Sequence, residues 1–121
     1  MRNYRDLRVW EEAHRLTLAV YAVTRGFPNE ERFGLTSQIR RASSSIAANL
    51  AEGCGRRSDG EMARFVQIAM GSAAELSYHI LLARDLRLIP DQCYTELCSH
   101  VERVMKMLSA LAGKLRSARP V

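Results

Sequence analysis

Glycine or proline interrupts the helical pattern of this chain at three internal junctions: residues 26–28, 53–55 and 90. Between these junctions apolar residues recur every three or four positions, which is the period of an amphipathic α-helix. The pattern therefore predicts four long helices. Their expected bounds are about residues 6–25, 36–53, 59–87 and 91–117.

Residues at the expected helix starts support this division. Ser58 or Asp59 is a suitable N-cap for the third helix, and Asp91 is one for the fourth. The apolar stripe of the fourth helix repeats at close to 3.5 residues, which fits either a coiled-coil-like seam or an ordinary bundle core. That stripe comprises Leu97, Val101, Val104, Leu108, Leu111 and Leu115.

Short connections between long helices favour antiparallel neighbours, because a short loop cannot carry the chain back along a helix. We therefore predict an all-α fold, an up-down-up-down antiparallel four-helix bundle. Its 121 residues, 47% hydrophobic content and mean hydropathy of −0.19 fit one globular domain over residues 1–121. Composition argues against a disordered chain and a membrane span, so we expect no membrane partner.

The chain is basic, with a formal charge of +5 and a pI near 9.6. Sixteen of its 18 basic residues are arginine, a bias that suits phosphate binding and that codon usage in a GC-rich genome explains equally well. Such a charge permits binding to a polyanion without requiring it.

Alternating helix direction would bring most of the positive charge to one end of the bundle. A solvated cluster that favours the dipole of the last helix is an equally good interpretation, and a patch contacting nucleic-acid phosphates is the functional one. Tyr4 and Trp10 lie near this end, where they could stack on bases, although Trp10 fits the core better. The acidic residues expected there are Asp6, Glu52, Asp59 and Glu61. The basic residues, our candidate nucleic-acid contacts, are Arg2, Arg5, Arg8, Arg56, Arg57, Arg64, Lys114, Arg116 and Arg119.

No motif predicts catalysis, a cofactor or a metal site. A carboxylate di-iron bundle needs two Glu-x-x-His motifs, and only Glu11 with His14 has that spacing. The three cysteines, an odd number with no CxxC pair, are typical of reduced thiols. Because the N-terminal stretch is also charged rather than apolar, we expect a cytoplasmic protein. These cysteines are Cys54, Cys93 and Cys98.

The second helix and the middle of the third carry many small residues, which favours either tight packing within the bundle or a seam between subunits. Asn49 falls beside the apolar stripe of the second helix, where its amide needs a partner such as Ser72, Glu75 or a backbone carbonyl.

Several motifs resemble, in order and spacing, the bacterial four-helix-bundle proteins named after intervening sequences in 23S ribosomal RNA genes. The resemblance covers residues from about 4 to 90. The family usually has Pro at the position of Ala47, so the resemblance predicts the fold but does not decide whether the second helix is kinked. The motifs are Leu7-Arg8-Val9-Trp10, Phe27-Pro28-x-x-Glu31, Gly34-Leu35-Thr36-Ser37-Gln38-Ile39-Arg40-Arg41-Ala42, Ser45-Ile46-Ala47-Ala48-Asn49-Leu50-Ala51-Glu52-Gly53 and Gly71-Ser72-x-x-Glu75-Leu76.

The resemblance implies a ring-shaped homopentamer of four-helix bundles with no assigned catalytic activity. Similar proteins are accessory subunits of diversity-generating retroelements, where a basic pentamer is thought to bind nucleic acid and a reverse transcriptase. Two functions therefore stay open: a homo-oligomer that binds RNA or DNA, and a protein scaffold that recruits an enzyme. The motif positions that the resemblance implies as internal packing, hydrogen-bonding or subunit contacts are Gln38, Arg41, Asn49, Glu52, Gly53, Gly71, Ser72 and Glu75.

Overall fold

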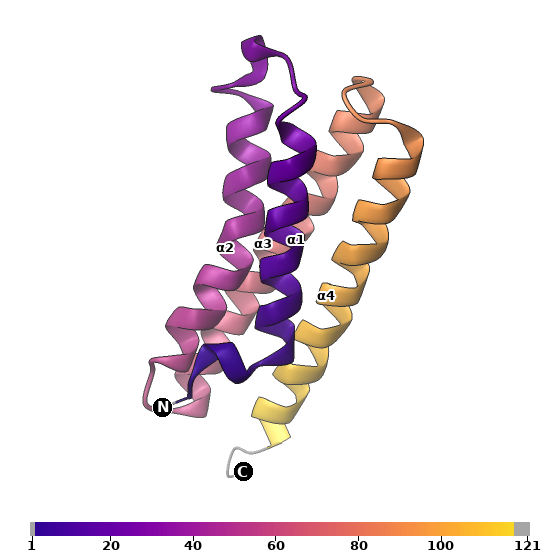
Figure 1. The fold of residues 1–121 in the computed structure, drawn as a ribbon. Helices are drawn as coiled ribbons and strands as arrows, with labels where there is room; N and C mark the ends of the chain where they lie inside the picture. Colours follow the sequence, from indigo (N-terminus) through magenta and orange to yellow (C-terminus); the bar gives the residue numbers. More distant parts are fainter. Residues whose placement is uncertain (1, 118–121) are drawn as a thin grey trace.

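The computed structural model describes residues 2–117, and four long α-helices make up most of them (Figure 1). The prediction of an all-α chain with four helices is confirmed, since no strand occurs within residues 2–117. The helices are α1 (Arg8–Thr24), α2 (Leu35–Cys54), α3 (Asp59–Asp85) and α4 (Asp91–Ser117). Two short 3-10 helices, η1 (Tyr4–Asp6) and η2 (Asn29–Glu31), were not expected from the sequence.

Figure 1 shows the four helices packed side by side, and hydrogen bonds join α1 to α2 and α2 to α3. The backbone N–H of Arg2 donates to the Cys54 carbonyl at 3.0 Å, whereas Thr24, at the other end of α1, accepts a bond from Arg40. Ser45 and Ser72 pair across α2 and α3. The starts of α1 and α3 and the ends of α2 and α4 therefore lie together, at the lower end in Figure 1.

The turn between α2 and α3 is held by a hydroxyl cap. Ser58, rather than Asp59, is the N-cap of α3, and its Oγ accepts a 3.1 Å bond from the Glu61 N–H. This cap satisfies one of the donors that a helix start leaves without an intrahelical partner. The sequence predicts Asp91 as the N-cap of α4, but the helix already begins at Asp91, one residue earlier than that cap implies, because the Pro90 carbonyl accepts a hydrogen bond from the Tyr94 N–H.

Helix α3 ends two residues earlier than expected because its last turn closes in a Schellman motif. Arg87 adopts a left-handed conformation with φ of 61°, and the Leu88 N–H donates to the Ala83 carbonyl at 2.9 Å. The chain then turns sharply toward Pro90 and α4.

The core runs along the whole bundle and receives apolar side chains from all four helices. Five of the six residues in the α4 stripe are buried, and Leu111 is half-buried, as expected of an ordinary bundle core. Helices α2 and α3 make the most extensive pair, and α1 and α4 the least. Within the described part of the chain, no helix combines the length and apolarity needed to cross a bilayer.

Two buried threonines provide a matched test of core polarity. Thr36 Oγ1 has no hydrogen-bond partner within residues 2–117, whereas Thr24 Oγ1 donates to the Val20 carbonyl and accepts from Arg40 Nε, both at 2.8 Å. Thr36→Val removes an unsatisfied buried hydroxyl, so we expect a gain of about 1 kcal/mol in the free energy of unfolding. Thr24→Val should cost about 1–2 kcal/mol. Urea unfolding followed by circular dichroism measures both, and equal effects of the two variants would contradict this account.

The three cysteines are free thiols in different environments. Burial raises the pKa of the Cys54 thiol, with a smaller opposing effect of Arg2, whereas Cys93 and Cys98 are half-buried on α4. Because the thiolate is the reactive form, we expect Cys54 to react with iodoacetamide more slowly than the other two. Peptide mass spectrometry of the native protein after timed alkylation measures this order, and rapid labelling of Cys54 would show that the end of α2 opens readily.

Candidate functional site

One end of the bundle carries the predicted positive charge. We call it the basic pole: the starts of α1 and α3, the ends of α2 and α4, and the segment before α1. Of the nine candidate contacts, eight lie within the described residues and Arg119 lies outside them.

Arg2 fastens the chain's first residues to the bundle. Its guanidinium bonds Asp59 at 2.7 Å and Met62 Sδ at 3.0 Å, and its backbone N–H bonds the end of α2. The side chain thus binds α3 and the backbone binds α2, so Arg2 links the segment before η1 to both helices. An arginine held in this way serves structure first, a role that the sequence did not reveal.

Two further arginines of the basic pole have partners in the chain. Arg56 pairs with Glu52 at 3.0 Å and lies over the ring of Phe65, 4.9 Å from its centroid. Arg5 lies 5.0 Å from the centroid of the Tyr4 ring. Exposed i,i+4 pairs such as Arg56 with Glu52 contribute little stability and leave the charge accessible to water.

The remaining cations of the basic pole have no carboxylate within 4.0 Å in residues 2–117. They are exposed, and none forms an ion pair within residues 2–117, although Glu61 borders the same groove as Arg64. At the opposite end of the bundle basic and acidic residues nearly balance: Arg25, Glu30, Glu31, Arg32, Arg40, Arg84, Asp85, Arg87 and Asp91. Arg5, which contacts only the Tyr4 ring, also has no carboxylate of the described residues within 4.0 Å, so the uncompensated cations of the basic pole are Arg5, Arg8, Arg57, Arg64, Lys114 and Arg116.

The aromatic residues near the basic pole pack on the protein itself. Trp10 is half-buried, with Tyr4 at its edge at 4.8 Å and the His14 ring stacked on it at 5.1 Å and 6°. Because His14 covers one face of the indole, the arrangement favours the core interpretation of Trp10 over base stacking.

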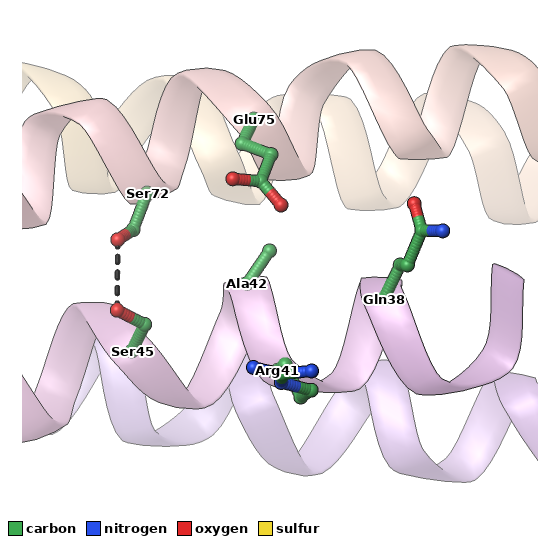
Figure 2. A pocket seen from close by; sticks show the side chains of 6 residues that line it. All are labelled: Gln38, Arg41, Ala42, Ser45, Ser72 and Glu75. Carbon is green, nitrogen blue, oxygen red and sulfur yellow. Dashed lines mark hydrogen bonds between the residues drawn. The ribbon is translucent and has the colours of Figure 1, made fainter. Parts of the chain in front are cut away.

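A second polar site lies between α2 and α3. It is an open groove of about 370 Å³, and Figure 2 shows the Glu75 carboxylate reaching toward α2 above Ala42, with Gln38 to one side. Four of the motif positions gather here although they come from two separate helices. The groove is lined by Gln38, Arg41, Ala42, Ser45, Ser72 and Glu75.

A short hydrogen-bond network closes one end of this groove. Asn49 Nδ2 donates to the Ser45 carbonyl at 2.8 Å and to Ser45 Oγ at 2.9 Å, and Ser45 Oγ pairs with Ser72 Oγ at 2.8 Å. Asn49 therefore has a backbone carbonyl as partner, one of the expected choices, and reaches Ser72 only through Ser45.

The other motif positions differ in their surroundings. Gly53 is buried against α3, whereas Glu52 is exposed and pairs with Arg56. Gln38, Arg41 and Glu75 are exposed, and so is Gly71. Internal packing therefore does not explain these four exposed residues within one chain.

The histidines are engaged with the chain's own side chains. His100 Nε2 lies 3.1 Å from Glu12 Oε2, which Arg103 also contacts at 3.4 Å, and this cluster joins α1 to α4. His79 is buried, and its Nδ1 lies 4.0 Å from Glu75 Oε2 but forms no hydrogen bond among the described residues. The structure groups no three His, Cys, Asp or Glu side chains suitably for a metal ion within residues 2–117. Sequence analysis missed the Glu12 cluster, because its members come from distant segments.

Gly53 and Gly71 differ in the space available for a side chain. A Cβ on Gly53 would lie 3.0 Å from Phe65 Cβ and 3.4 Å from Met62 Cγ, whereas a Cβ on Gly71 would meet nothing within 4 Å. We expect Gly53→Ala to destabilise the fold by about 1–3 kcal/mol through overpacking. Gly71→Ala should stabilise the isolated chain by about 0.5–1 kcal/mol because alanine favours the helix. Chemical denaturation at low protein concentration measures both, and a loss of stability in the second variant would contradict an open Gly71.

Comparison with known proteins identifies the family. The model of the 23S rRNA-intervening sequence protein family matches residues 5–110. No curated protein matches the chain. Among solved structures, a protein of unknown function from the S23 ribosomal protein family of Bacteroides thetaiotaomicron is similar with a TM-score of 0.80 and 22% sequence identity, covering 86% of this chain and 97% of that one. The fold is thus shared with that protein, and the chain belongs to the 23S rRNA-intervening sequence protein family.

Proposed function

We propose that this chain is a non-enzymatic homo-oligomer that binds nucleic acid through its basic pole. The observation that carries the proposal is the uneven charge: at one end of the bundle, cations without an ion-pair partner outnumber the unpaired carboxylates Asp6 and Glu61, whereas charges nearly balance at the other end. Positive side chains that contact phosphates displace condensed counterions, which gives affinity with little dependence on base sequence. Arginine, which dominates here, matches phosphate oxygens with two parallel donors.

The oligomer is supported by apolar and small residues on the outer face of α3. Ile68 and Tyr78 are 42% and 58% exposed, and Gly71 lies between them with open space around it. Residues 68, 71, 75 and 78 follow one another at helical spacing, so they share a face away from the core. A second copy packing there would cover these apolar groups and explain a glycine that the single chain does not need.

The ring-shaped homopentamer implied by the family resemblance extends this proposal. In a ring with all subunits in the same orientation, five basic poles would lie on one face and add their fields. Such a face would attract phosphate much more strongly than one chain.

Salt-dependent binding tests the nucleic-acid role. We compare wild type with an Arg8→Ala, Arg57→Ala, Lys114→Ala variant for binding to duplex DNA and duplex RNA. On DNA, the slope of log affinity against log salt should shrink by about 0.9 for each phosphate that the variant no longer neutralises. The matched control removes three charges away from the basic pole, with Arg25→Ala, Arg32→Ala and Lys106→Ala, and should retain most of the slope. Equal reductions of the slope in the two variants would contradict a role for the basic pole.

Light scattering after size exclusion tests the assembly in the same samples. A mass of five chains supports the homopentamer, and a Tyr78→Glu variant should reduce that mass if the outer face of α3 forms the seam. A monomeric wild type would overturn the assembly proposal.

A second candidate function is a protein scaffold that recruits an enzyme such as a reverse transcriptase. The exposed Leu18 and Phe33, which lie outside the proposed seam on α3, favour it, because apolar contact surfaces retain affinity when salt rises. An oligomer that binds neither RNA nor DNA at low salt would favour this scaffold over the nucleic-acid role.

A further inference from the structure

A groove of about 250 Å³ lies between α3 and α4 at the basic pole. Arg64, in the second turn of α3, lines it from one helix, and Arg116, in the last turn of α4, lines it from the other. Residues from two separate helices thus meet at one site. The lining residues are Gly60, Ala63, Arg64, Gln67, Ala112 and Arg116.

The charge of this groove distinguishes it from four other surface grooves. Each of those carries at least one carboxylate beside its cations, from Glu75, Asp85 with Asp91, Glu102 or Glu61. The α3–α4 groove is lined by two guanidinium groups and an amide and by no carboxylate. Arg64 also borders the neighbouring groove that contains Glu61, but neither Arg64 nor Arg116 has an ion-pair partner within residues 2–117, so an anion entering the α3–α4 groove displaces no internal pair.

The groove walls leave room between the two arginines. Gly60, Ala63 and Ala112 present at most a methyl group, so no large side chain fills the space. Two guanidinium groups that line one open groove suit a tetrahedral anion, because each can donate parallel bonds to two of its oxygens. Methyl groups beside them suit the carbon atoms of a sugar.

We propose that the α3–α4 groove is a phosphate-ester site that holds one backbone phosphate of a nucleic-acid strand between Arg64 and Arg116. The Gln67 amide donates to a further oxygen of the phosphate or of the neighbouring ribose. This inference rests on the proposed nucleic-acid role and names the contact that carries it. Because the two arginines belong to different helices, a bound phosphate also ties the last turn of α4 to α3.

Affinity for a short single-stranded RNA tests the site through a double-mutant cycle. Arg64→Ala and Arg116→Ala should each lower affinity about tenfold, the effect of removing a charge-assisted hydrogen bond. The double variant should be weakened by less than the product of the two single effects, because each arginine needs the other to hold the phosphate. The matched control is Arg57→Ala with Lys114→Ala, two exposed cations of the same pole outside the groove, whose effects should multiply. Circular dichroism checks that all variants fold.

Lysine variants separate bidentate binding from simple charge. Arg64→Lys and Arg116→Lys keep the charge and remove the planar fork, so we expect a loss of affinity smaller than that of the alanine variants but still measurable. Full affinity in both would overturn the bidentate phosphate site.

Pyrophosphate as a probe distinguishes the site from the nucleic-acid role. It should raise the unfolding temperature of wild type and leave that of the double alanine variant unchanged. If this happens but wild type binds neither RNA nor DNA, the phosphate site stands and nucleic-acid binding fails. If wild type binds RNA and the two groove variants behave like the control pair, the site is overturned and the basic pole stands.

Discussion

Helices α2 and α3 approach closely because the side chains at their interface are small. The positions of the α2–α3 groove and of the basic pole depend on that close approach. Gly53 leaves space for Phe65 and Met62, and two serine hydroxyls meet at 2.8 Å farther along. Larger groups at these points would force the helices apart, because protein cores have little free volume. The resulting register brings Glu75 over Ala42 and sets the turn at Ser58 where the basic pole begins.

The basic pole follows from topology as much as from composition. Its cations come from four separate segments, and alternating helix direction brings these segments to one end. Arg2 adds a further tie, because its contacts with Asp59 and with the end of α2 hold the chain start beside α3. The pole therefore contains two kinds of arginine: those that hold the structure together and those whose charge faces solvent.

Much of the fold could be predicted because local patterns specify it, whereas the candidate sites were predicted less completely. Apolar spacing located the four helices to within two residues at every end. The end of α3 differs by two residues because Arg87 adopts a left-handed conformation that glycine usually occupies. The short 3-10 helices escaped prediction because three residues carry no periodic signal. Nothing in the sequence distinguished Arg64 and Arg116 from the other cations, because only the packing of α3 against α4 brings them to one groove without carboxylates. The Glu12 contacts with His100 and Arg103 had no sequence signal at all.

Helix content, helix bounds and the excess of positive charge follow from the order of the amino acids alone, because they depend on local periodicity and on counting. Tertiary packing was needed to establish which charges are compensated, which small residues are packed and which are open, and which polar groups share a groove. Ion pairs, close packing and hydrogen bonds act over a few ångströms. Residues far apart in the chain come within that range only once the helices have packed in register.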